Sequence, residues 1–424
     1  MRVLYDISTL GLAHFYQQSR GGACRVDLNI TEGLVASGEC ELFFCANHST
    51  VAHHGCEAFL RGHPRLGAVP LVARRMSGAR SSVRALTTAA HKSVRRLFGK
   101  NVLPSAIRHV AGLVDRRLHP PVGDAASGIA IFHCSPSTPL PAPAKRGSPQ
   151  RFLTVYDLAA IRYPALYGAG YRRYLVGALR SLKAGDNVIT NSNFVRDEVL
   201  AAGIAPRDRI HVVPLAADST LFHRCTDPQR LAAVRDKYRI PEGPYVLGVT
   251  NPDLRKNVPH AVHAFARAAH EARDALVSLV LAGSAGPGSD QIRQAIAEYP
   301  ALRGRVVQTG HVPDDDLAPL YTGARVFVYP SIYEGFGLPP LEAMQCGTPV
   351  ITSNTSSLPE VVGDGGVMVA PDDIDALAGA MLDLARDTVR RDHLRRRALA
   401  RARGFSWELS TAATLRAYRT ALEA

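Results

Sequence analysis

Short apolar runs alternate with amphipathic stretches from one end of the chain to the other. Each run is only a few residues long and rich in Val, Ile, Leu and Phe, which predicts a buried β-strand. A first series of runs lies at Val3–Asp6, Leu42–Cys45, Val69–Val72, Ile129–His133, Phe152–Asp157, Val188–Thr190 and Ile210–Pro214. A second series lies at Tyr245–Val249, Val277–Ala282, Val306–Thr309, Val326–Tyr329, Val350–Thr352 and Val367–Val369.

Stretches with helical character separate most of these runs. In the first series they include Arg25–Ser37 and Asn193–Ala202. In the second series they lie at His260–His270, Asp290–Glu298, Leu317–Thr322, Pro340–Cys346 and Ile374–Ala385. Strands that alternate with helices form βαβ units around a parallel sheet. The chain is therefore predicted to be an α/β protein with two doubly wound halves, which face a ligand cleft at the carboxyl ends of their strands.

The pattern is weakest around Thr220–Pro244, where prolines and a glycine interrupt it. We place the linker between the two halves there. The length of 424 residues is sufficient for two hydrophobic cores. The expected division is a first domain at residues 1–220, a second at residues 221–404, and a closing helix at residues 405–424 that returns toward the first domain.

Composition is ordinary for a globular protein, with 46% hydrophobic and 21% charged residues. No apolar window approaches the roughly 18 residues of a membrane span. The N-terminus also lacks the apolar core of a secretory signal, so we expect a cytoplasmic protein. Seven Cys without a Cys-x-x-Cys pair indicate reduced thiols, and neither a disulfide framework nor a zinc site.

The net charge of +13 is unevenly distributed. Eleven Lys or Arg lie between Arg74 and Arg117 against one acid, Asp115. Within this cluster, Val83–Phe98 has apolar residues at helical spacing and basic residues elsewhere. Such a helix can contact the anionic inner face of a membrane, or it can pack on the core of the first domain. No aromatic interleaving or recognised motif accompanies the charge, so we expect no nucleic-acid binding.

The segment after the run Val326–Tyr329 combines residue types suited to an anion. It contains Glu334, Gly335 and Gly337, and a helix is expected to begin near Pro339 or Pro340. Glycines let the backbone approach a ligand closely, and the start of a helix offers free N–H groups and a positive dipole end. The segment therefore predicts a diphosphate site. Glu342 is expected in the first helical turn, so that Glu334 and Glu342 flank one ligand from two directions.

The spacing of Glu334 and Glu342 within Glu-Gly-Phe-Gly-Leu-Pro resembles the donor-site signature of the retaining glycosyltransferases of GT-B fold known as glycosyltransferase family 4. Further segments resemble that family in the right order, at residues 21–22, 190–195, 212–218, 248–257, 310–317, 358–366 and 405–408. The resemblance implies a GT-B fold of two Rossmann-like domains, the first on the acceptor side and the second binding a nucleotide-sugar donor.

The resemblance also implies roles for matching residues. Glu342 would bind the donor ribose, and Glu334 would contact hydroxyls of the transferred sugar. Arg255 and Lys256 would neutralise the leaving diphosphate. Backbone N–H groups would hold sugar and diphosphate at Gly335, Phe336, Gly337 and Leu338. Other positions expected near the donor are Gly22 in the N-terminal glycine loop, and Asn251, Val312 and Glu360 around the nucleotide.

On the acceptor side the likeness is looser. Many family members carry His-Asp-Leu where this chain has Tyr156, Asp157 and Leu158. Asp157 is expected either to orient a donor hydroxyl or to cap a turn. His133 either faces the cleft or serves as a structural hydrogen-bonding group.

The sequence predicts no metal and no cofactor beyond the donor. No Asp-x-Asp pair follows an apolar strand, and Asp314, Asp315 and Asp316 are interpreted as the cap and first turn of a helix. The segment 252–257 and the overall pattern resemble enzymes of O-antigen or capsule assembly that use GDP-mannose. The resemblance therefore implies mannose as the transferred sugar, and rhamnose or another hexose stays open. The acceptor is expected to be a glycan or lipid-linked glycan of surface polysaccharide. The alternatives are a nucleotide-sugar 2-epimerase, and a degenerate glycosyltransferase kept for binding or assembly.

Overall fold

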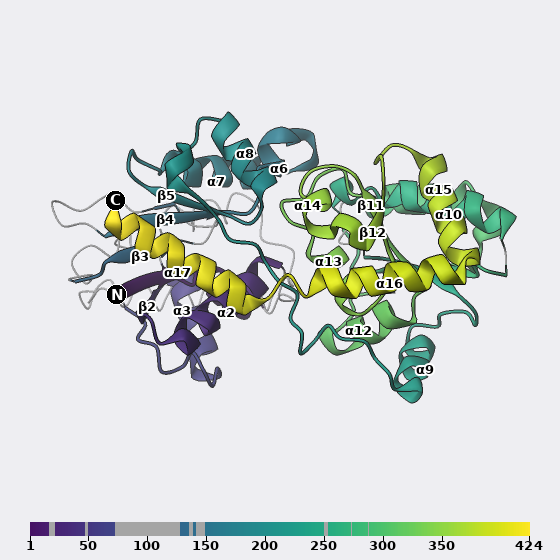
Figure 1. The fold of residues 1–424 in the computed structure, drawn as a ribbon, viewed down its shortest axis with the longest axis horizontal. Coiled ribbons are helices and arrows are strands. Elements are labelled where there is room, and N and C mark those ends of the chain that lie inside the picture. Colours follow the sequence, from purple (N-terminus) through teal and green to yellow (C-terminus); the bar gives the residue numbers. More distant parts are fainter. Residues whose placement is uncertain are drawn as a thin grey trace, which may run out of the picture.

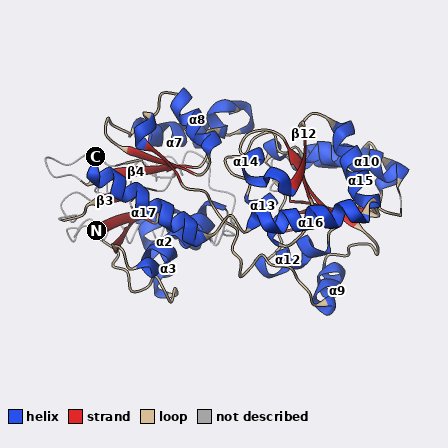
Figure 2. Ribbon diagram, viewed as in Figure 1, coloured by secondary structure: helices blue, strands red, loops and turns tan. Residues whose placement is uncertain are grey.

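The computed structural model describes residues 1–16, 22–46, 50–72, 128–134, 139–140, 149–249, 253–272, 274–286 and 288–424. In this part of the chain two six-stranded sheets lie side by side, each flanked by helices (Figure 1, Figure 2). The strand orders are β2-β1-β3-β4-β5-β6 and β12-β11-β10-β7-β8-β9. All named strand pairs are parallel, so the predicted α/β class with two doubly wound halves is confirmed.

The first sheet contains β1 (Arg2–Asp6), β2 (Glu41–Cys45), β3 (Ile131–Cys134), β4 (Gln150–Val155), β5 (Asn187–Thr190) and β6 (Ile210–Val212). Its helices are α1 (Ser8–Tyr16), α2 (Gly22–Ser37), α3 (Thr50–Arg61), α6 (Ala159–Arg162), α7 (Ala169–Arg180) and α8 (Asn193–Ala201). Every residue of β3 and β5 is buried, because helices cover both faces of a parallel sheet. Burial on both faces explains why these strands are continuous apolar runs in the sequence.

The second sheet contains β7 (Tyr245–Val249), β8 (Ser278–Ala282), β9 (Val306–Gly310), β10 (Val326–Tyr329), β11 (Val350–Ser353) and β12 (Gly366–Val369). Its helices are α9 (Pro228–Lys237), α10 (Val258–Glu271), α11 (Ser289–Ala297), α12 (Asp314–Gly323), α13 (Leu338–Gln345), α14 (Leu358–Val362), α15 (Ile374–Arg386) and α16 (Thr388–Ala402). As predicted, the three aspartates 314–316 form the first turn of α12, but the residue at the N-cap is Pro313 and not an aspartate.

Two sequence-based expectations need correction. Val69–Val72 is not a strand, because only Leu71 forms an isolated bridge, to Phe44. Pro70 has no N–H and cannot extend a ladder. The predicted linker also contains helix α9, which packs on α12. Arg230 and Lys237 of this segment bind the Asp316 carboxylate at 2.6 and 2.5 Å.

The last helix, α17 (Trp407–Glu423), lies along the first half although α16 lies on the second (Figure 1). It contacts α2 and β4. The Ser410 hydroxyl donates to the carbonyl of Pro214 at 2.6 Å, and Tyr418 is fully buried. The chain thus crosses between the halves a second time at its end.

Candidate active site

Two loops at one edge of the second sheet form the centre of the candidate site. β7 and β10 are parallel neighbours, with Val328 beside Gly248, so their carboxyl ends meet at the same edge. A 3₁₀ turn at Leu254–Lys256 follows β7. The loop that carries Glu334 follows β10 and leads into α13. This topology brings Arg255 and Lys256 to Glu334, as the sequence predicts.

Glu334 is buried and held by donors on both carboxylate oxygens. Oε1 accepts from Lys256 Nζ and from the Ser331 hydroxyl, each at 2.7 Å. Oε2 accepts from Arg255 at 2.9 Å. Burial raises the pKa of Glu334, but the two cations outweigh it and lower the pKa to about 2. Glu334 is therefore ionised at any physiological pH.

The two cations also have their own supports. Arg255 donates to Asp253 at 2.7 Å and to the carbonyl of Tyr333 at 3.0 Å. Lys256 Nζ donates to the Tyr329 hydroxyl and lies 4.8 Å from the centroid of that ring. Burial lowers the pKa of Lys256, and Glu334 opposes this. These contacts fix two positive charges beside the Glu334 carboxylate.

The glycine loop after Glu334 packs tightly on the first half. A Cβ added at Gly335 would lie 2.0 Å from the carbonyl oxygen of Tyr156, so a side chain would displace the loop. The Gly335 carbonyl accepts from the Ser192 hydroxyl at 2.7 Å. Gly337 has a φ of +111°, a conformation that favours glycine. The buried ring of Phe336 contacts Phe405 edge-on.

Helix α13 begins at Leu338, directly after the left-handed turn at Gly337. Glu342 is its fifth residue and lies in the second turn, so the expectation of a first-turn position was wrong. The side chain is buried. Its oxygens accept from Arg25 at 3.2 Å and from the Tyr321 hydroxyl at 3.0 Å. Burial raises the pKa of Glu342, and Arg25 opposes this.

Arg25 is a site residue that the sequence analysis missed. It lies in the first turn of α2 and reaches Glu342 and Asp314 in the second half. A cation in the first turn of a helix is unfavourable because the dipole is positive there. That position was the available signal that the charge serves a contact outside its own helix.

On the acceptor side, two residues have structural contacts. Asp157 Oδ1 caps a turn by accepting from the N–H of Ala159 at 3.0 Å, which agrees with the capping role that the sequence allowed. Burial raises the pKa of Asp157, with Arg255 opposing it. The Tyr156 hydroxyl donates to Asp27 of α2 at 3.3 Å.

His133 is a structural hydrogen-bonding group, which is one of the two roles that the sequence allowed. Its ring nitrogens lie 2.6 Å from the Tyr418 hydroxyl and 2.7 Å from the Thr154 hydroxyl. Complete burial lowers the pKa of His133 to about 3, which keeps the ring neutral.

The remaining predicted donor residues lie on several elements, and the structure places Gly22 against the glycine loop. Gly22 begins α2, and a Cβ there would meet Leu338 at 3.6 Å. Val312 is buried ahead of α12. Glu360 accepts from the Asn193 N–H at 2.9 Å at the start of α8. Asn251 and the basic segment Val83–Phe98 lie outside the described residues.

Within the described ranges, no three His, Cys, Asp or Glu side chains gather into a group suited to a metal ion. Metal independence stays a prediction. In the same ranges, no helix has the length and apolar character needed to cross a membrane.

The fold matches solved glycosyltransferase structures over nearly the whole chain. Sucrose-phosphate synthase from Thermosynechococcus elongatus has a TM-score of 0.64 and 21% identity, covering 99% of this chain and 98% of that one. WaaG, a glycosyltransferase involved in lipopolysaccharide biosynthesis, has a TM-score of 0.62 and 13% identity, covering 98% and 99%. The likeness to these structures shows that the chain has the GT-B fold.

Sequence comparison gives the family. Residues 232–401 match the family described as glycosyl transferases group 1. The O-antigen chain mannosyltransferase B of Escherichia coli is 38% identical over 267 residues, which cover 63% of this chain and 69% of that relative. The serotype-specific mannosyltransferase WbdA of Escherichia coli is 31% identical over 238 residues, 56% of this chain but only 29% of that protein. The chain belongs to the group 1 glycosyl transferases.

Proposed function

We propose that the chain transfers a hexosyl unit, with mannosyl as the preferred candidate, from a nucleoside-diphosphate sugar to a glycan or lipid-linked acceptor in O-antigen or other surface polysaccharide synthesis. The names of both Escherichia coli relatives support mannose, and the name of the first supports O-antigen. The observation that carries the proposal is the buried cluster of Glu334, Lys256 and Arg255.

This cluster suits departure of a diphosphate. The acceptor hydroxyl bonds to the anomeric carbon while the bond from that carbon to the diphosphate oxygen breaks, and the acceptor proton passes to the leaving diphosphate. Lys256, Arg255 and the start of α13 supply positive charge where negative charge builds. A divalent metal would duplicate that charge, so we propose a metal-independent reaction.

Glu334 is assigned to positioning donor hydroxyls. A carboxylate nucleophile of the kind used by retaining glycosidases needs a free oxygen lone pair aimed at the anomeric carbon. Both oxygens of Glu334 already accept hydrogen bonds from cations, and its pKa of about 2 makes it a weak base. We therefore propose retention through attack on the face from which the diphosphate leaves.

A donor screen by mass spectrometry tests the proposal. Wild type, Glu334→Gln and the matched control Glu423→Gln, which neutralises an exposed carboxylate at the C-terminus, are incubated with GDP-mannose, UDP-glucose and dTDP-rhamnose. Each reaction is run with and without an octyl mannoside acceptor. Glycosylated acceptor that disappears in Glu334→Gln and persists in Glu423→Gln is the expected result.

The other outcomes separate the alternatives. An epimerised donor formed without acceptor would indicate a 2-epimerase. No consumption of any donor, with binding retained, would indicate a degenerate protein. Near-full activity of Glu334→Gln would overturn the site assignment.

Membrane contact through the basic segment 74–117 is part of the proposal for a lipid-linked acceptor. Its test is flotation with vesicles containing anionic lipid. Association at low salt that weakens as salt rises is expected, and no association at low salt would contradict it.

A further inference from the structure

A cavity lies at the edge of the second sheet that is opposite the edge carrying Glu334. It has a volume of about 460 Å³. Its walls include Pro244, Arg325 and Pro349, which lie at or next to the amino ends of β7, β10 and β11. These strands are parallel, and four residues of β10 span roughly 13 Å. The cavity is therefore separate from the candidate donor site at the carboxyl ends.

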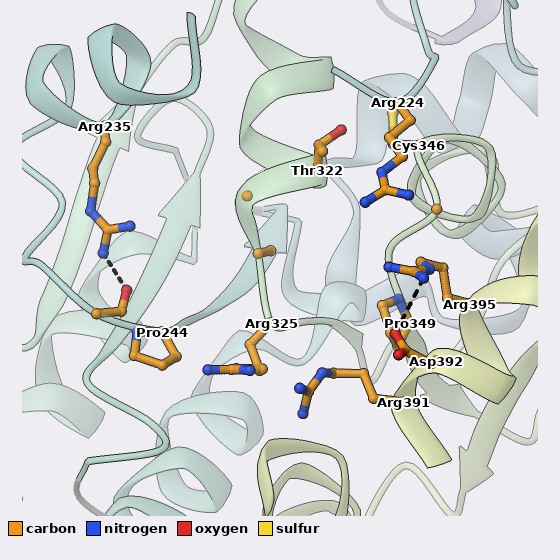
Figure 3. Close-up of a pocket in the computed structure, with 14 residues that line it drawn as sticks. Arg224, Arg235, Pro244, Thr322, Arg325, Cys346, Pro349, Arg391, Asp392 and Arg395 are labelled. Carbon is orange, nitrogen blue, oxygen red and sulfur yellow. Dashed lines mark hydrogen bonds and ion pairs between the residues drawn. The ribbon is translucent and has the colours of Figure 1, made fainter. Parts of the chain in front are cut away.

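Arginine side chains dominate the cavity (Figure 3). The arginines that line it are Arg224, Arg235, Arg325, Arg391 and Arg395. One carboxylate, Asp392, accompanies them and pairs with Arg395 at 3.3 Å. Five positive charges less one negative charge leave a formal charge of +4 on the lining.

Two of these guanidinium groups donate hydrogen bonds to backbone carbonyls. Arg391 donates to the carbonyls of Leu384 and Ala385 at 2.8 and 3.2 Å, where α15 ends. Arg235 donates to the carbonyls of Pro241 and Gly243. Such contacts are common for arginines near helix ends. Carbonyl groups have no net charge, so both arginines still add to the positive field of the cavity.

The guanidinium groups of Arg224 and Arg325 have no such hydrogen-bond partners. Neither guanidinium has a hydrogen bond or ion pair with any residue that the structure describes. Arg325 is half-buried, and burial together with the nearby Arg391 lowers its pKa. Figure 3 places the side chains of Arg325 and Arg391 near each other, and both line the cavity. Like charges are thus gathered in a recess where an anion would relieve their repulsion.

We propose that this cavity binds the diphosphate group of a small anionic ligand. Guanidinium groups match phosphate oxygens in a forked geometry, which makes phosphate the favoured anion. One phosphate group carries about −1.5 to −2, so two are needed to balance a charge of +4. The volume lies within the roughly 300–1,000 Å³ of small-molecule sites. A ligand here would contact the amino ends of the strands whose carboxyl ends carry Lys256 and Glu334.

Calorimetric titration with inorganic pyrophosphate at low salt tests the site. Two binding events are expected in wild type, one in this cavity and one at the candidate donor site. Arg224→Gln/Arg325→Gln should weaken the first about tenfold or more and keep the second. Lys256→Gln should do the reverse. The matched control Arg303→Gln/Arg396→Gln removes two exposed arginines of the same half that lie outside the cavity and should keep both events.

Two outcomes would overturn the site. One is unchanged pyrophosphate binding in the cavity variant, and the other is an equal loss in the control variant, which would indicate general charge attraction. Arg224 is exposed, so Arg224→Gln alone serves if the double variant unfolds. Vesicles of phosphatidylcholine with phosphatidic acid distinguish a lipid headgroup from a soluble ligand. Vesicle binding that Arg224→Gln leaves unchanged excludes the cavity as a lipid site.

Discussion

Replacing Glu334 by Gln should remove a stabilisation whose size follows from the surroundings of the carboxylate. Burial raises the pKa of Glu334, yet Lys256 and Arg255 bring it down from 4.5 to about 2. The difference of about 2.5 pKa units, at about 1.36 kcal/mol each, corresponds to roughly 3 kcal/mol of unfolding free energy at neutral pH. The neutral amide of Gln lacks this interaction with the two cations, so the free energy of unfolding of the variant should be lower by about 3 kcal/mol at pH 7.

The pH dependence gives the sharper test. The folded-state pKa of Glu334 is depressed, so its stabilisation is complete above the unfolded-state value near 4.5 and is lost as the pH falls toward 2. At pH 3.5 the same two pKa values predict a loss of roughly 1 kcal/mol of this stabilisation. The gap in stability between wild type and Glu334→Gln should narrow by that amount between pH 7 and pH 3.5.

Urea unfolding followed by circular dichroism at the two pH values measures the gap. Glu423→Gln removes a carboxylate from the exposed end of α17 and should change stability by less than about 0.5 kcal/mol. A gap below about 1 kcal/mol at pH 7, or one of equal size at both pH values, would refute the argument that the two cations hold Glu334 ionised.

Three further predictions concern activity. Arg25→Gln removes the positive charge that most strongly lowers the pKa of Glu342 against the effect of burial, so this pKa should rise and the acid limb of the pH profile for donor KM should move to higher pH. The control Arg396→Gln should leave the limb in place, and an unmoved limb in Arg25→Gln would count against the contact. Gly335→Ala places a Cβ 2.0 Å from a backbone oxygen and should lower kcat/KM about 100-fold. In the control Gly379→Ala the new Cβ meets nothing within 4 Å and should have little effect, so similar rates for both variants would contradict the tight packing of the loop. Turnover should stay within about twofold after chelation with EDTA, and a loss restored by Mg²⁺ or Mn²⁺ would disprove metal independence.

Sequence alone predicted most of the framework because strands buried on both faces of a parallel sheet are apolar runs in the sequence. The run at Val69–Val72 misled because apolar composition does not reveal whether a neighbouring strand offers a full ladder. Helix α9 was missed because most of its residues are exposed and its apolar pattern is weak.

The candidate site also contains residues that the sequence predicts and residues that it does not reveal. Glu334, Arg255 and Lys256 could be brought together from sequence because each follows a strand that ends at one sheet edge. Arg25 could not, because it reaches Glu342 from a residue 317 positions earlier. The structural role of His133 depends on its hydrogen bond with Tyr418 of α17, which is also distant in the sequence.

Contacts from the first half hold the groups proposed to bind the donor. Ser192 donates to the carbonyl of Gly335, the Tyr156 carbonyl limits residue 335 to glycine, and Arg25 fixes Glu342. The positions of Glu342 and of the glycine loop after Glu334 therefore depend on the relative placement of the two halves. Exchange of the first half for that of a relative should alter donor affinity as well as acceptor choice, since it replaces the partners of the glycine loop and of Glu342.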